Sequence, residues 1–152
     1  SFDINYRARL WPPQEARQTL APLLQEVAIL LCTLEDARML LEGEPDAAGA
    51  ALALAERFRV RTAVVTDGGL CAAVADGRPL AQEGFTVEAV DRIGAGDAFA
   101  AGVLQGWLAG SMERGLACGM AAAALKHTFH GDVAMITPRD VEDLIAGRSR
   151  WR

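Results

Sequence analysis

The chain has 152 residues, of which 51% are hydrophobic, so it is long enough to bury one sizeable core and need not form more than one domain. Its formal net charge of −5 disfavours a nucleic-acid partner, and no signal peptide or long apolar span indicates a membrane. The three cysteines, at positions 32, 71 and 118, form neither a C-x-x-C pair nor a zinc spacing, which indicates a reducing cytoplasm.

The first half of the chain predicts strands that alternate with helices. The run from Val27 to Cys32 is continuously apolar, which is typical of a strand buried on both faces of a parallel sheet. Thr33 is followed three residues later by Asp36, a pattern that begins a helix. We expect strands at 1–5, 27–32 and 62–66, and helices at 14–26, 33–43 and 44–58.

The second half predicts a hairpin followed by three helices. Asp76-Gly77 is a two-residue turn signal that joins an expected strand at 70–75 to another at 78–82. A short extended piece is expected at 86–90, and helices are expected at 95–110, 112–128 and 137–147. Strands that alternate with helices indicate an α/β layered domain with a mostly parallel sheet.

The stretch from Asp91 to Gly102 carries the clearest chemical signal. Gly94 and Gly96 allow a tight turn with uncovered amides where an apolar helix begins at Ala95, and such a helix N-terminus suits an anion. Asp97 lies in the first turn, where the helix dipole favours an ionised carboxylate. A carboxylate beside an anion site suits a base that deprotonates a hydroxyl during phosphoryl transfer. The alternative is that Asp97 is only a helix N-terminal residue after a glycine turn.

This stretch resembles the second signature of the ribokinase-like (PfkB) carbohydrate kinases, D-T-x-G-A-G-D-x-F-x-x-G, and departs from it at Arg92. Residues 2–11 are similar to F-D-x-N-Y-R-x-x-L-W, and residues 125–132 are similar to L-K-x-T…G-D, two segments of 2-keto-3-deoxygluconate kinases. The resemblance implies a ribokinase-like layered α/β/α fold, with ATP and Mg²⁺ as cofactors. It implies that Asp97 is the catalytic base.

The same resemblance implies that the amides of Gly94, Ala95 and Gly96 stabilise charge on the transferred phosphoryl group. Members of this family carry a further N-terminal half with a sugar-binding lid. Residues 1–152 therefore resemble their C-terminal nucleotide-binding and catalytic half. A homo-oligomer formed through the lid half is a possible arrangement.

Further site residues near the N-terminus are implied by the resemblance. Asp3, Asn5 and Arg7 alternate, so a strand would place them on one face. Arg7 would bind the carboxylate of a sugar acid or the ATP phosphates, because a guanidinium pairs with such groups in a bidentate way. Asn5 would bind the triphosphate. The alternative is an exposed edge strand.

A second implied nucleotide contact is the turn at residues 66–71, where the family pattern is T-x-G-x-x-G. Thr66 and Gly68 match this pattern, Gly69 lies at one of its variable positions, and Cys71 replaces the last glycine. The resemblance implies nucleotide contact at Thr66, Gly68 and Gly69, whereas a Cβ at Cys71 would narrow the approach to the backbone. The alternative is a plain turn between two elements. Asp132 would contact the sugar acid, or it is an ordinary loop aspartate.

No metal ligand is assigned from the sequence. Thr33 and Asp36 occupy the place of an N-x-x-E motif that the family links with Mg²⁺ and phosphate. We interpret them as a helix cap, and the alternative is that their oxygens hold Mg²⁺ indirectly through water. His127 and His130 are three residues apart, but the helix is expected to end at residue 128, between them, and Gly131 follows. A shared metal face is therefore improbable. The apolar side chains at 99, 103, 104 and 107 are interpreted as core.

The resemblance implies an ATP-dependent sugar-acid kinase, with 2-keto-3-deoxygluconate as the expected substrate and a terminal hydroxyl as the acceptor. Another ribokinase-like sugar kinase, such as a fructokinase or ribokinase, is the alternative within the family. A non-catalytic fragment that binds only a nucleotide or a partner is a further alternative. A dinucleotide-binding oxidoreductase is disfavoured, because Phe99 stands where its fingerprint needs glycine or alanine.

Overall fold

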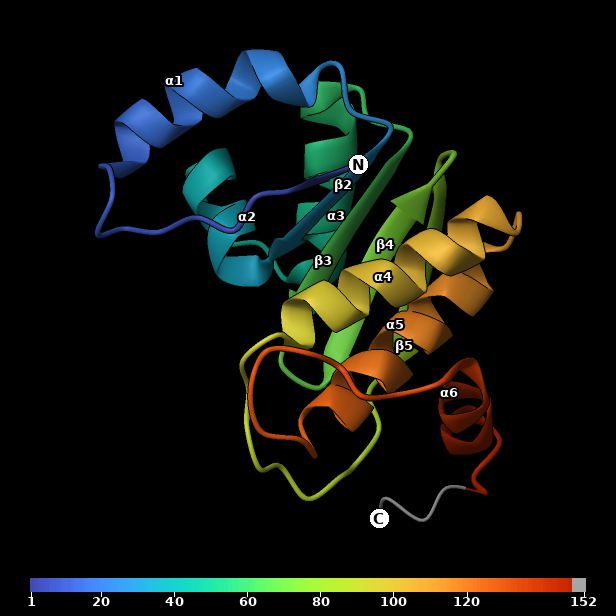
Figure 1. The fold of residues 1–152 in the computed structure, drawn as a ribbon. Helices are drawn as coiled ribbons and strands as arrows, with labels where there is room; N and C mark the ends of the chain where they lie inside the picture. The colour runs from blue at the N-terminus through green and yellow to red at the C-terminus, as the bar shows by residue number, and fades with distance from the viewer. Residues whose placement is uncertain (149–152) are drawn as a thin grey trace. The chain divides into compact units, whose positions relative to one another are not determined.

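The computed structural model describes residues 1–148, and it confirms the α/β class, with five strands and six helices in that range. The chain forms two compact units, the first over residues 1–81 and the second from residue 82 onward. Figure 1 shows the order of their elements along the chain. Over the described part of the chain, no helix is both long and apolar enough to cross a membrane.

The sheet runs in the order β1 to β5. Its parallel part consists of β1 (Phe2–Asp3), β2 (Ile29–Thr33) and β3 (Thr62–Asp67), which pair in register with Phe2 opposite Leu30 and Ile29 opposite Thr62. Strand β4 (Leu70–Ala75) then pairs antiparallel with β3, and β5 (Arg78–Glu83) lies beyond β4. The sheet is therefore mixed, because two hairpins follow the parallel strands.

Three helices accompany the strands of the first unit: α1 (Pro13–Leu24), α2 (Leu34–Leu41) and α3 (Ala47–Phe58). Consecutive residues from Ile29 to Cys32 are all buried, as are those from Thr62 to Val65, which confirms strands covered on both faces. Alanines and leucines of α2 and α3 pack with these strands in one apolar core. Apolar burial of this kind stabilises the unit at about 25 cal/mol for each Å² removed from water.

Two expectations about extended segments are wrong. Strand β1 ends at Asp3, and Asn5 has a left-handed backbone with φ 43, so Asp3, Asn5 and Arg7 do not share the face of one strand. Residues 86–90 form no strand. The amide of Val90 donates to the carbonyl of His127 at 2.7 Å, and a hydrogen bond to the end of a helix takes the place of strand pairing.

The second unit contains α4 (Ala95–Leu108), α5 (Met112–Lys126) and α6 (Pro138–Ile145). Helices α4 and α5 approach closely through small residues: a Cβ built on Gly102 would lie 2.6 Å from the backbone of Cys118. The side chains of Phe99 and Val103 are buried, as expected, whereas Leu104 and Trp107 are only half-buried. Apolar side chains of α4, α5 and α6 form a separate core for this unit.

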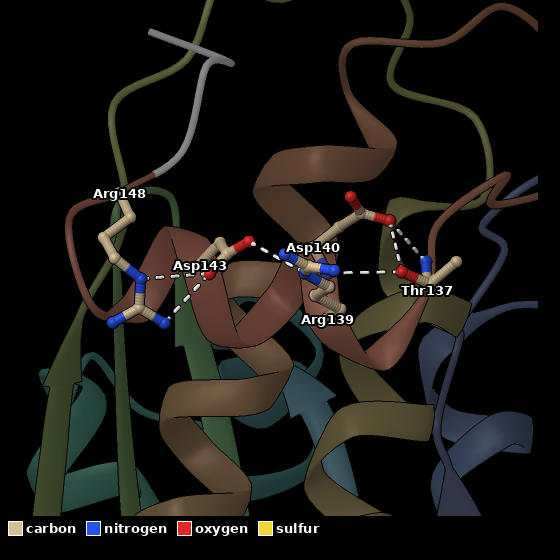
Figure 2. Close-up of polar contacts among 5 residues, drawn as sticks. All are labelled: Thr137, Arg139, Asp140, Asp143 and Arg148. Atoms are coloured by element: carbon tan, nitrogen blue, oxygen red, sulfur yellow. Dashed lines mark hydrogen bonds and ion pairs between the residues drawn. The ribbon is translucent and has the colours of Figure 1, made fainter.

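Helix α6 is held at both ends by polar contacts, shown in Figure 2. At its start, the Asp140 carboxylate accepts hydrogen bonds from the Thr137 amide at 2.8 Å and from the Thr137 hydroxyl at 2.6 Å. This capping box begins the helix where the sequence predicts it. After its end, the guanidinium of Arg148 donates to Asp143 at 2.9 Å. Arg139 lies one turn before Asp143 and pairs with the same carboxylate at 3.8 Å.

Candidate active site

The N-terminus of α4 has the form of an anion site. Gly94 has φ 79, and this left-handed residue turns the chain into the helix. Among residues 1–148, the amides of Gly94, Gly96 and Asp97 donate to no protein acceptor. Ala95 differs from the expectation, because its amide donates to the Arg92 carbonyl at 3.3 Å. Three amides at the positive end of α4 are therefore free for an anion.

Asp97 lies in the first turn of α4, and its side chain is exposed. Gly96 is also exposed, and a Cβ built on it would meet no atom within 4 Å. The space beside the carboxylate is therefore open to a ligand. A carboxylate next to free amides has the arrangement that general-base catalysis of phosphoryl transfer needs.

The structure brings Asp132 next to this turn. A Cβ built on Gly94 would overlap the Asp132 carbonyl oxygen and lie 3.0 Å from its carbonyl carbon. The side chain of Asp132 is exposed. Of the residues expected to contact substrate, Asp132 thus lies adjacent to the anion site.

Sequence reasoning missed Asp91 as a structural part of this site. Its Oδ1 accepts a hydrogen bond from the Ile93 amide at 3.1 Å, and its Oδ2 accepts one from the Gly131 amide at 2.9 Å. These two bonds hold the pKa of Asp91 below its ordinary value, and the bond from the Ile93 amide has the larger effect. Asp91 opens the signature-like stretch, but its partner Gly131 is 40 residues away, and no local pattern reveals that contact.

In the first unit, the expected ligand residues gather at the carboxyl ends of the parallel strands. Thr33 ends β2 and lies directly opposite Thr66 of β3. The Thr66 hydroxyl donates a hydrogen bond to the Cys32 carbonyl oxygen at 3.5 Å. Asn5 follows the end of β1 by two residues and is exposed. In α/β proteins, this edge of a parallel sheet is where ligands bind.

The turn between β3 and β4 consists of Gly68 and Gly69, both exposed and both with open space where a Cβ would be. A phosphate or a nucleoside can therefore approach the backbone there. Cys71 is fully buried, so its side chain does not narrow this turn.

Arg7 and Asp36 lie near each other in the first unit. The guanidinium of Arg7 is exposed, and its Nη1 donates to the Tyr6 carbonyl at 3.2 Å. The Asp36 carboxylate is buried, and it accepts a hydrogen bond from the Thr33 amide at 3.3 Å. Burial raises the pKa of Asp36, and the charge of Arg7 acts in the opposite direction.

The capping role of this pair is observed directly, because the Thr33 hydroxyl accepts from the Asp36 amide at 3.1 Å. A buried carboxylate that already accepts a backbone hydrogen bond is a poor ligand for a hydrated cation. Within residues 1–148, no three His, Cys, Asp or Glu side chains gather to hold a metal. Any metal ion at residues 1–148 would therefore take most of its ligands from water or from a bound anion.

Known proteins resemble this chain over most of its length. The pfkB family carbohydrate kinases match residues 1–138. A 2-dehydro-3-deoxygalactonokinase of Haloferax volcanii is 42% identical over 151 residues, which are 97% of this chain and 47% of that protein. The chain thus spans about half the length of the curated relative that it matches.

Solved structures share the fold. The 2-dehydro-3-deoxygluconokinase of Thermotoga maritima aligns with a TM-score of 0.85 and 28% identity, over 95% of this chain and 49% of its own. A candidate ribokinase II from E. coli, in complex with ATP and Mg²⁺, aligns with a TM-score of 0.84 and 24% identity, over 97% of this chain and 48% of its own. At that identity, the second likeness concerns the fold alone.

Proposed function

Because the chain belongs to the pfkB family of carbohydrate kinases, we propose that it is the C-terminal nucleotide-binding and catalytic half of an ATP-dependent kinase acting on a 2-keto-3-deoxy sugar acid. The observation that carries this proposal is the start of α4, where the exposed Asp97 carboxylate adjoins the free amides of Gly94 and Gly96. The Haloferax and Thermotoga relatives, both named as kinases of 2-dehydro-3-deoxy sugar acids, support the substrate class.

In the proposed reaction, Asp97 accepts the proton of a terminal hydroxyl of the sugar acid. The hydroxyl oxygen then bonds to the γ-phosphorus of ATP, and the bond from that phosphorus to the β–γ bridging oxygen breaks, which releases ADP. The amides of Gly94, Gly96 and Asp97 hold the developing negative charge. Mg²⁺, when bound with ATP, neutralises phosphate charge.

We assign the other ligand residues by the chemistry of their exposed groups. Thr66, Gly68 and Gly69 form an open turn at the end of β3 that suits the nucleotide, and Asn5 suits its phosphates. Arg7, with an exposed guanidinium, suits the carboxylate of the sugar acid or the ATP phosphates. Asp132 suits the hydroxyls of the sugar. The three cysteines are buried, which is consistent with a cytoplasmic location.

The proposal is tested by release of ADP from Mg²⁺-ATP by the full-length protein, with a 2-keto-3-deoxy sugar acid, fructose and ribose as separate acceptors. Asp97→Asn keeps the shape of the side chain and removes its basicity, so kcat is expected to fall roughly 10²- to 10⁴-fold. Asp46→Asn changes an exposed helix-capping carboxylate of α3 and serves as the matched control, with unchanged kcat. Equal activity of Asp97→Asn and the wild type would refute the assignment of the base.

The same assay separates a sugar-acid kinase from the other sugar kinases of the family. Arg7→Lys keeps the charge and loses the planar fork that grips a carboxylate. If Arg7 binds the substrate carboxylate, kcat/KM falls more for the sugar acid than for a neutral ketose. Equal losses for both acceptors would assign Arg7 to the ATP phosphates instead.

A further inference from the structure

A second carboxylate lies beside the anion site and takes no part in the proposed proton transfer. The two oxygens of Asp91 accept from two different loops: Oδ1 from the Ile93 amide at 3.1 Å, just before α4, and Oδ2 from the Gly131 amide at 2.9 Å, after α5. One side chain therefore joins the turn that forms the anion site to the loop that carries Asp132.

Backbone contacts continue this connection on both sides of Asp91. The amides of Val90 and Asp91 both donate to the His127 carbonyl, at 2.7 and 3.0 Å. Beyond Asp91, the backbone of Asp132 packs on Gly94 so closely that no Cβ fits between them. Residues 90–94 thus contact the segment 127–132 at His127, Gly131 and Asp132, and Asp91 supplies the side-chain bond among these contacts.

The loop is also anchored from inside the unit. Lys126, the last residue of α5, is fully buried, and its ammonium donates to the Phe129 carbonyl at 3.0 Å. Its positive charge favours the ionised form of Asp91. A lysine side chain is rarely buried completely, because its charge is costly to remove from water. Here it holds the loop in the position from which Gly131 reaches Asp91.

We infer that Asp91 is a positioning residue, whose carboxylate fixes the turn at Gly94–Gly96 to the loop at Gly131–Asp132 so that the amides, Asp97 and Asp132 keep their relative places during phosphoryl transfer. The inference rests on the proposed function. A shift of about 1 Å in a reacting group can cost roughly 10²-fold in rate, so loss of this bond acts mainly on kcat.

The test compares Asp91→Asn with Asp140→Asn in the full-length protein. Asp91→Asn keeps one acceptor oxygen and replaces the other with an amide group that cannot accept a hydrogen bond. Asp140 is the matched control, because it also accepts two hydrogen bonds, from Thr137, but it lies at the start of α6 and touches none of the proposed site residues. The measurements are kcat, KM for ATP and for the sugar acid, and hydrogen exchange of the Gly131 amide.

For Asp91→Asn we expect faster exchange at Gly131 and a kcat lowered by about tenfold or more, with both KM values within about threefold of the wild type. For Asp140→Asn we expect unchanged kcat and unchanged exchange at Gly131. If Asp91→Asn does not fold, Asp91→Glu keeps the charge and displaces the oxygens by one methylene group, and the same fall in kcat is expected.

An unchanged kcat in a folded Asp91 variant whose Gly131 amide exchanges faster would overturn the inference and leave the proposed function intact. A rise in KM with kcat preserved would also overturn it, since the residue would then contribute to binding. Absence of phosphoryl transfer in the wild type with every acceptor would refute the proposed function, and the inference with it. Wild-type activity therefore distinguishes the two failures.

Discussion

The backbone of Asp132 packs directly against Gly94, at a place where even one methyl group would overlap the Asp132 carbonyl. Gly94 also has φ 79, a backbone conformation that residues with a Cβ rarely adopt. Two independent requirements thus fix glycine at the residue that precedes α4. The contact joins residues 38 positions apart, and it decides where the anion site lies relative to Asp132.

Gly94→Ala is therefore expected to destabilise the protein by about 1–3 kcal/mol, from backbone strain together with a steric overlap that only a loop movement can relieve. Gly96→Ala is the matched control two residues later, since a Cβ there meets no atom within 4 Å. We expect it to change stability by less than about 0.5 kcal/mol. Urea unfolding of both variants measures the difference, and equal costs would contradict the close approach of Asp132.

Local signals predicted much of the fold. The hairpin from β4 to β5 lies within one residue of its expected position, because Asp76-Gly77 determines the turn, with φ 47 and φ 78 at its two residues. Both Thr-x-x-Asp helix starts, at Thr33 and at Thr137, are capping boxes as their spacing indicates. These features depend on a few neighbouring residues, so sequence alone is sufficient for them.

Features that depend on distant residues were not predictable in this way. The alternation of residues 1–5 continues past Asp3, but Asn5 adopts a left-handed conformation and the strand stops. The bond from Gly131 to Asp91 leaves no periodicity in the sequence. Lys126 has the charge of a surface residue, and its complete burial depends on the Phe129 carbonyl within reach of its ammonium. Tertiary contacts decide all three.

The seam between α4 and α5 yields a second test of packing. A Cβ on Gly106 would overlap the backbone of Gly115 and lie 2.9 Å from the Ser111 carbonyl. Gly106→Ala must push the helices apart, so a loss of about 1–3 kcal/mol is expected, which is the usual range for overpacking a tight interface. Thermal unfolding gives the result, with Gly96→Ala as the reference at the exposed start of the same helix. A loss below about 0.5 kcal/mol would mean that the helices are not in contact there.

The two capping boxes are expected to respond to pH with opposite signs. Asp36 is buried, and burial raises its pKa above the ordinary 3.8, so the folded state binds the proton more tightly than the unfolded state. Its contribution to stability is most favourable below pH 3.8 and declines as the pH rises through the raised value. Relative to Asp36→Asn, the wild type should therefore lose stability across that interval.

Asp140 has the reverse behaviour. Hydrogen bonds from the Thr137 hydroxyl and then from the Thr137 amide lower its pKa below 3.8. Its stabilising contribution is therefore present above pH 3.8 and is lost as the pH falls through the lowered value. Urea midpoints of the wild type, Asp36→Asn and Asp140→Asn between pH 3 and pH 6 measure both slopes. For each variant, the measured quantity is the difference in urea midpoint from the wild type as a function of pH. If this difference changes with pH in the same direction for Asp36→Asn and Asp140→Asn, burial of Asp36 does not control its ionisation.

His127 offers a probe of the charges around the anion site. Burial lowers its pKa below the ordinary 6.5, and the positive charges of Arg92 and Lys126 lower it further. The folded state thus favours the neutral imidazole. Stability associated with His127 is present above pH 6.5 and is lost as the pH falls below that value, because the unfolded chain binds the proton more readily.

The shift can be measured by NMR titration of the imidazole. Arg92→Gln removes one of the two charges, so the pKa of His127 is expected to move back toward 6.5 without reaching it, because burial is the larger cause. Arg139→Gln removes an exposed charge of α6 and serves as the control, with no expected movement. If Arg92→Gln leaves the titration of His127 unchanged, the guanidinium of Arg92 does not act on this imidazole. The Arg92 guanidinium would then point away from residues 127–132 and into the solvent.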